Sequence, residues 1–218
     1  AAAAAASGAA GGELASASSR PPRGPAKVTS STAIFELGTT VDIPTLLGAV
    51  PNSEPMNGGQ AVVRFLRKPK WAAVVHPNGR VKMFATFEGG ELRLAAKRAA
   101  RLLKCRYSSS VRFRMYRLVN VIVHSRLAFR VDVEELVGRL ESARGRAELA
   151  GGAQAQLISH ELRSVLPHVV LRVAGEPGTD VRVQQTGALD VFRSKGQSEA
   201  ESAMETLVPL LAQFQMWW

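Results

Sequence analysis

The stretch Val41-Asp42-Ile43, followed by Leu46-Leu47, recurs 90 residues later as Val131-Asp132-Val133, followed by Leu136-Val137. Each copy has the same order of features: an apolar residue, an aspartate, a second apolar residue and an apolar pair three positions on. A period of this length is too long for the repeats of a solenoid. The recurrence therefore predicts a duplicated half-domain rather than an array.

A second pair of segments follows in the same order. In the first copy, Arg67-Lys68-Pro69 is followed by an apolar strand, a turn at Gly79 and another strand. In the second copy, Arg172 to Pro177 is followed by a strand, a turn at Gly187 and another strand. Two such halves predict pseudo-twofold symmetry, and a two-fold saddle is a shape that can sit across a duplex.

Apolar periodicity and turn residues place the elements of each copy. Asp42 is expected to cap a short helix with Pro44 in its first turn, and Pro77-Asn78-Gly79 is expected to form a hairpin turn. In the first copy we expect strands at Thr32–Thr40, Ala61–Arg67, Trp71–His76 and Val81–Thr86 and a helix at Glu91–Lys104. In the second we expect a strand at Phe113–Val123, a helix at Asp132–Arg144, three strands between Val165 and Val191, and a helix at Glu199–Phe214.

This order predicts an α+β fold in which two pseudo-symmetric half-repeats form one curved antiparallel sheet with helices on one face. Residues 1–27 are rich in Ala, Gly, Ser and Pro and are expected to be a disordered low-complexity tail. The first repeat would span 28–112 and the second 113–218. An insertion near 138–157 supplies 18 extra residues, which we expect to lengthen the helix and its exit loop.

The positive charge is concentrated in the first half. The whole chain of 218 residues has a formal net charge of +10. Residues 31–112 carry 13 Lys/Arg against 5 Asp/Glu, whereas residues 113–218 carry 12 of each. This asymmetry indicates an anionic partner for the first half. An unevenly basic but merely solvated surface is the alternative.

Signs of enzymatic chemistry are weak. The four histidines lack metal-ligand spacing, and a single cysteine, Cys105, rules out an internal disulfide framework. The chain has no Walker loop, no GxGxxG motif and no apolar run long enough to span a membrane. Ser159-His160-Glu161 are adjacent in sequence, which is poor geometry for a catalytic triad. We therefore expect no enzyme, no cofactor, no metal and no membrane partner.

Alternation along the strands predicts which side chains face away from the helices. Arg80, Lys82, Phe84 and Thr86 share one side of their strand, opposite Val81, Met83 and Ala85. In the second copy, Asp180, Arg182 and Gln184 share a side, as do Asp190 and Phe192. The open face is thus expected to be basic in the first half and to carry repulsive carboxylates in the second.

The segments Gly79–Thr86 and Leu94–Arg101 resemble the core of the TATA-box-binding protein family. The family pattern there is a Gly-Lys turn, a strand ending Thr-Gly-Ala and a helix carrying Leu-Ala-x-Arg-Lys-x-Ala-Arg. The match runs without a gap from Pro69 to Lys104, and Leu37–Ile43 is similar to the family's Leu-Gly-x-x-Leu-Asp-Leu segment. In the second copy, Leu166-Pro167 and Arg172 resemble the family's Phe-Pro and following Arg, so the resemblance covers about residues 28–215.

The departures from the family pattern bear on function. The four phenylalanines that the family inserts between base steps correspond to Gly59, His76, Leu166 and Gln184, so only Leu166 remains an apolar wedge. Two base-contacting threonines near the dyad become Phe84 and Phe192, paired asparagines become Ser30 and Arg117, and two valines become Lys82 and Asp190. The family is itself a known example of minor-groove kinking by wedges. Their loss predicts weak TATA specificity for the chain alone.

The resemblance implies a nuclear transcription initiation factor that binds double-stranded DNA in the minor groove, weakly when alone. Its further partners would be general transcription factors and the RNA polymerase machinery. Candidate DNA-binding residues are Ser30, Arg67, His76, Arg80, Lys82, Phe84, Arg117, Leu166, Arg172, Arg182 and Phe192. Candidate partner-binding residues are Arg93, Lys97, Arg98, Arg101, Lys104 and Glu161. The alternative is a protein-only adaptor that kept the saddle and lost DNA binding.

Overall fold

A computed structural model describes residues 23–143, 146–148, 154–174 and 178–216. The expected tail therefore lies outside the described residues as far as residue 22. The first half contains β1 (Lys27–Glu36), α1 (Ile43–Ala49), β2 (Ser53–Met56), β3 (Gln60–Phe65), β4 (Trp71–Val75), β5 (Arg80–Ala85) and α2 (Gly89–Arg106).

The second half repeats this order with additions. It contains β6 (Arg114–Arg126), β7 (Arg130–Val131), α3 (Val133–Ser142), β8 (Arg146–Glu148), β9 (Gln154–Glu161), β10 (His168–Val173), β11 (Thr179–Gln184), β12 (Ala188–Ser194) and α4 (Gln197–Leu211). A 3₁₀ turn (Ala212–Phe214) and β13 (Gln215–Met216) follow, and β13 pairs with β7 in a small two-stranded sheet.

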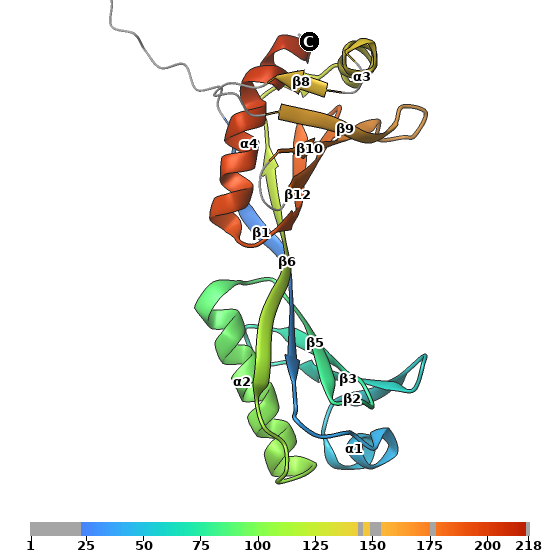
Figure 1. Ribbon diagram of the computed structural model, residues 1–218, viewed down its shortest axis with the longest axis vertical. Coiled ribbons are helices and arrows are strands. Elements are labelled where there is room, and N and C mark those ends of the chain that lie inside the picture. The colour runs from blue at the N-terminus through green and yellow to red at the C-terminus, as the bar shows by residue number, and fades with distance from the viewer. Residues whose placement is uncertain (1–22, 144–145, 149–153, 175–177, 217–218) are drawn as a thin grey trace, which may run out of the picture.

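All the other strands form one antiparallel sheet of eleven strands in the order β2-β3-β4-β5-β1-β6-β12-β11-β10-β9-β8. The long strands β1 and β6 pair at the centre and join the two halves. Figure 1 shows the halves stacked along the long axis, with α2 and α4 on one side of the sheet. The α+β architecture predicted from the sequence is confirmed.

Each half has its own hydrophobic core on the helix-covered side of the sheet. In the first, Phe35, Met83 and Leu92 are buried together; in the second, Leu171, Leu189 and Leu207 are. Strand alternation explains this, because every second residue of β5 and β11 is buried and those between are not. The opposite face of the sheet is left without covering helices (Figure 1).

The cap predicted at Asp42 is present, and Asp132 caps the equivalent helix of the second half. The Asp42 carboxylate accepts a hydrogen bond from the Thr45 backbone N–H at 3.0 Å, and Asp132 accepts from Glu135 N–H at 2.9 Å. The bond to Thr45 lowers the pKa of Asp42. A side chain that satisfies a free N–H of the first turn fixes where a helix begins.

Five described strands, β2, β7, β8, β9 and β13, were not expected from the sequence, and the insertion differs from its expectation. β2 forms one edge of the large sheet, and β9 with β8 forms the other. The helix α3 is longer than α1, with 10 residues against 7, but much of the insertion forms β8 and the start of β9 rather than an exit loop. Backbone pairing of β8 with β9 extends the sheet by one strand in this half.

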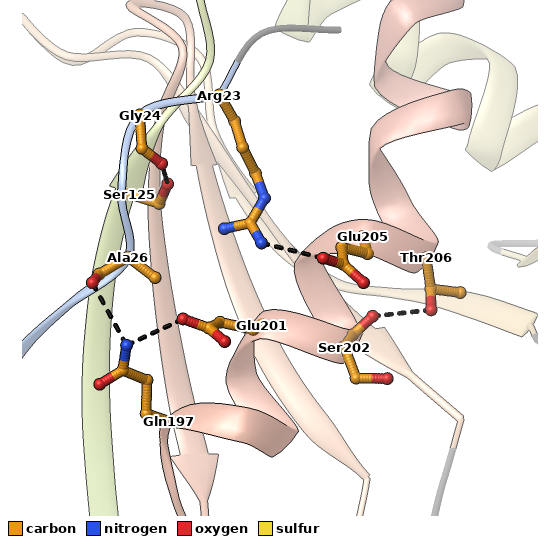
Figure 2. A network of polar contacts seen from close by, with 9 residues as sticks. All are labelled: Arg23, Gly24, Ala26, Ser125, Gln197, Glu201, Ser202, Glu205 and Thr206. Atoms are coloured by element: carbon orange, nitrogen blue, oxygen red, sulfur yellow. Dashed lines mark hydrogen bonds and ion pairs between the residues drawn. The ribbon is translucent and has the colours of Figure 1, made fainter. Parts of the chain in front are cut away.

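The chain is also ordered earlier than expected. Arg23 to Ala26, assigned to the tail, lie against the second half, as Figure 2 shows. Arg23 forms an ion pair with Glu205 at 3.1 Å, and Ser125 Oγ donates to the Gly24 carbonyl at 2.9 Å. Gln197 Nε2 donates to the carbonyl of Ala26 at 3.4 Å and to Glu201 at 2.8 Å. The segment that leads into the first half is thereby tied to α4 and β6 of the second.

A second link between the halves is made by Glu88. Both of its carboxylate oxygens accept from the Gln197 backbone N–H, at 2.9 and 3.0 Å, at the start of α4. The N-terminal position Gly196 of that helix has no capping side chain of its own. A carboxylate from the first half therefore caps the main helix of the second, where the helix dipole favours negative charge.

We predict that Glu88→Ala lowers the free energy of unfolding by about 1 kcal/mol, the usual contribution of a cap. Urea denaturation followed by circular dichroism measures this. Glu148→Ala, which removes an exposed carboxylate on β8, serves as the control and should leave the midpoint nearly unchanged. Equal midpoints for both variants would show that the Glu88 bond contributes nothing.

The two hairpin turns have the same construction in both halves. Gly79 and Gly187 each have a φ of 82°. The Gly79 carbonyl accepts from Leu37 N–H at 2.9 Å and the Gly187 carbonyl from Leu127 N–H at 2.8 Å. A Cβ on either glycine would collide with a backbone carbonyl, that of Thr39 or Phe129 respectively. Only glycine fits here, because both the backbone angle and the space exclude a side chain.

We predict that Gly79→Ala destabilises the fold by about 1–3 kcal/mol, because it adds left-handed strain and displaces the Thr39 carbonyl. Gly138→Ala is the matched control: this glycine lies within α3, and an added Cβ meets nothing within 4 Å. Since alanine favours helix, the control should gain about 0.5–1 kcal/mol. Thermal unfolding that showed the same sign for both variants would contradict the prediction.

Candidate nucleic-acid interface

The open face of the first half is basic and has few compensating acids. Arg80 and Phe84 are exposed on β5, and Lys82 between them is half-buried. On the central strands, Arg117 of β6 lies opposite Ile34 of β1 and shares its face. Among the described residues of this face, Arg64 forms an ion pair with Glu54 at 2.9 Å. Arg80, Lys82 and Arg117 form no ion pair with any described residue.

The open face of the second half carries charges that are largely paired with one another. Arg172 makes a two-pronged contact with Asp180 at 2.7 and 3.2 Å, and Arg193 reaches the same carboxylate at 3.4 Å. The hydrogen bond to Asp180 raises the pKa of the Arg172 guanidinium. Asp180, one of the two carboxylates that we expected to repel phosphate, is therefore matched by cations of the same face.

Asp190 is held in a similar way. One of its oxygens lies 2.8 Å from His124 Nδ1 on the neighbouring strand, and Gln184 Nε2 donates to the other at 3.4 Å. A nearly neutral patch of this kind offers less long-range attraction to phosphate than the free cations of the first half.

The candidate DNA-binding residues are brought together with two exceptions. Ser30, Arg80, Lys82, Phe84, Arg117, Arg172, Arg182 and Phe192 lie on strands with the register of the open face, and His76 directly follows β4. Arg67 and Leu166 lie outside the strands, in the loops after β3 and β9. Arg172 is bound to Asp180 and is not a free phosphate contact in this structure.

Sequence reasoning named Leu166 but missed Met56 and Val165, the other exposed apolar side chains at the tips of the β2–β3 and β9–β10 hairpins. Met56 is 47% exposed in the β2–β3 hairpin, and Val165 and Leu166 are 98% and 54% exposed in the loop after β9. Figure 1 shows both projecting from the sheet on the side away from α2 and α4. Apolar side chains of this kind can wedge between base steps. The pairing of β2 with β3, which places Met56 at a tip, was not visible in the sequence.

The covered side presents helices of opposite charge. α2 carries six Lys/Arg and one Glu, whereas α4 carries three Glu and no Lys or Arg. The five predicted partner-binding cations of α2 are all exposed: Arg93, Lys97, Arg98, Arg101 and Lys104. Arg93 lies 6.0 Å from the ring of Tyr116, whose pKa is raised by burial. Glu161 is exposed at the end of β9 in the second half, whereas these cations lie on α2 of the first half.

No metal-binding group of His, Cys, Asp or Glu is found among the described residues. No helix in the part of the chain that the structure covers is long and apolar enough to cross a membrane. The prominent features of the site are thus cations, aromatic rings and a long curved sheet.

The described chain is thus an α+β saddle whose helix-free sheet face is basic in the first half. The chain has the fold of TBP from Methanococcus jannaschii, with a TM-score of 0.64 at 16% identity, over 86% of this chain and 98% of that one. It is also 27% identical over 107 residues to TATA-box-binding protein-like 1 of Entamoeba histolytica. That match spans 48% of this chain and 49% of the relative. No family model matches the chain.

The sequence similarity agrees with the resemblance of the motifs at Gly79–Thr86 and Leu94–Arg101 to the TATA-box-binding protein family, and the structural similarity shows the same fold.

We predict that Asp180→Asn strengthens nonspecific DNA binding several-fold at low salt, because it frees Arg172 and Arg193 for phosphate. Each new phosphate contact should steepen the salt slope of log K by about 0.9. Anisotropy of a labelled duplex across a salt series measures both effects. Glu134→Gln on α3 removes one negative charge away from the open face and should change neither the affinity nor the salt slope. An equal gain in affinity in both variants would show that the effect comes from net charge alone.

Proposed function

We propose that this chain is a TBP-like transcription initiation factor that binds promoter DNA on its open sheet and nucleates a preinitiation complex. Its own specificity for TATA is weak. The observation that carries this proposal is the group of unpaired cations Arg80, Lys82 and Arg117 on a face that no helix covers. Such a face attracts phosphate, and the similarity to TATA-box-binding proteins supports double-stranded DNA as the ligand.

Weak specificity follows from the side chains that replace aromatic wedges. Wedges offset the cost of unstacking by opening a wider groove, and smooth bending of a site costs roughly 1–6 kcal/mol. Gly59 has no side chain, and His76 and Gln184 are polar and half-buried. Met56, Val165 and Leu166 supply apolar atoms at the tips but no aromatic ring. The chain therefore depends on partner proteins to hold DNA in a bent form.

In this proposal the chain acts in the nucleus, and its protein partners are general transcription factors and the RNA polymerase machinery. The exposed cations of α2 fit an acidic protein surface, and they lie on the opposite side of the sheet from the DNA. DNA and a protein regulator can thus bind at the same time without competing for one surface. Glu161, the other predicted contact, belongs to a separate surface near the β9 tip.

A protein-only adaptor is the second candidate. It is favoured by the pairing of Asp180 with Arg172 and Arg193, which withdraws two cations of the second half of the open face from contact with phosphate. In that case the exposed ring of Phe84 would contact a partner protein instead of the minor groove of DNA.

The test is fluorescence anisotropy of the chain with a TATA duplex and a scrambled duplex of equal length, across salt. We expect equal binding of both duplexes, roughly 10⁻⁴–10⁻⁶ M at physiological salt, with a steep salt dependence. Lys82→Glu should weaken both and flatten the salt slope, whereas the same charge reversal at Arg106 on α2 should have a smaller effect.

A clear TATA preference would contradict the weakened specificity, because it would mean that the remaining side chains still kink DNA. No binding to either duplex at low salt would favour the protein-only adaptor.

A further inference from the structure

Each half of the open face presents an aromatic ring next to a cation. Lys82 Nζ lies 5.0 Å from the ring centroid of Phe84, and Arg182 Cζ lies 5.1 Å from that of Phe192. Phe84 is 37% exposed, and Phe192 is half-buried. The two rings occupy equivalent positions, each five residues after the turn glycine of its half.

The two cations reach their rings from different positions. Lys82 precedes Phe84 by two residues on the same strand, whereas the corresponding residue in the second half is Asp190. There the cation comes from Arg182 on the neighbouring strand β11, directly opposite Asp190. A ring with an adjacent cation thus occurs in both halves, although the cation comes from a different sequence position in each. This indicates that the ring and the cation act together in binding.

Arg182 has unused hydrogen-bonding capacity. Its Nε is buried and has no hydrogen-bond partner, and in the described part of the chain its guanidinium forms no ion pair. No protein carboxylate therefore competes with a ligand for the guanidinium of this half-buried side chain. Phosphate oxygens and base edges are both suitable acceptors.

The backbone beside Phe192 is arranged irregularly. The pairing of β12 with β6 shifts register between Val191 and Ser194, and Arg193 adopts a φ of 63°. The Asn120 side chain accepts from Arg193 N–H at 2.7 Å and holds this bulge. Bulges re-aim neighbouring side chains, and strained residues gather at functional sites. Asn120 is therefore a positioning residue for the ring of Phe192.

The spacing of the rings favours an unpaired strand over a duplex. Between them lie β1 and β6, with Thr32 opposite both Phe84 and Asn120, so the rings are three strand spacings or roughly 14 Å apart. In a duplex, bases of one strand follow each other at about 3.4 Å and their faces are covered by stacking. Rings this far apart reach base faces only where the stack is opened, and an unpaired strand presents such faces without the unstacking cost that a duplex carries.

We propose that the open face binds single-stranded nucleic acid, with unpaired bases stacked on Phe84 and Phe192 and the adjacent phosphates held by Lys82 and Arg182. Aromatic rings that stack bases beside cations that follow the backbone are the usual means of binding single strands. In the free chain the flexible Lys82 covers its ring by a cation–π contact, and it moves to a phosphate when a base stacks. This inference rests on the proposed function only in placing nucleic acid on the open face.

The experiment measures anisotropy of a labelled mixed-sequence 12-mer, as a single strand and as its duplex, with the full chain. We expect the single strand to bind more tightly than the duplex. Phe84→Ala and Phe192→Ala should each weaken single-strand binding roughly tenfold, a larger factor than the one by which they weaken duplex binding. Phe84→Trp should restore binding and show fluorescence quenching by the stacked base. Leu94→Ala, an exposed apolar residue on α2, is the matched control for truncation.

The outcomes separate this inference from the function on which it draws. Salt-dependent duplex binding with no single-strand preference overturns the inference and leaves the proposed function standing. Failure to bind either form overturns both. Single-strand binding that survives the loss of both rings, in variants with unchanged circular dichroism, also overturns the inference. So does ring-dependent binding of polyglutamate in place of the oligonucleotide, which would make the face a protein-docking surface.

Discussion

The antiparallel pairing of β1 with β6 is the constraint on which the rest of the molecule depends. Its register runs from Lys27 opposite His124 to Glu36 opposite Arg114, with three irregularities along the way. Because it joins two half-sheets edge to edge, neither half has a free edge at the centre. It also brings the starts of α2 and α4 close enough for Glu88 to cap α4. The residues before β1 then lie against the second half, where Arg23 reaches Glu205.

The two faces of the sheet differ because helices cover only one of them. The buried side holds two separate cores, so each half keeps its own packing while the backbone is shared. The other side is a single surface of free polar and aromatic groups. Its two halves have diverged in charge: Lys82 is unpaired, whereas Asp190 at the corresponding position is matched by His124. A pseudo-symmetric scaffold therefore presents an asymmetric binding surface.

Features determined by neighbouring residues could be predicted from the sequence. The caps Asp42 and Asp132 bond to N–H groups three residues on, and the turn at Gly79 needs a positive φ that its own residue type allows. β2 and β9 could not be predicted, because Pro55 and flanking glycines resemble a loop until a partner strand fixes them. Ion pairs such as Arg172 with Asp180 depend on register between strands, which periodicity alone does not give.

The sequence by itself determined the duplication, the α+β class, the excess of positive charge in the first half and the face on which Lys82, Phe84 and Phe192 lie. These follow from local rules with periods of two or a few residues. Only the tertiary structure decided which charges are free, where Arg23 is anchored and that each ring has a cation beside it. Such facts depend on contacts between residues far apart in the chain, as with Arg23 and Glu205, and their geometry is fixed only when the whole sheet is assembled.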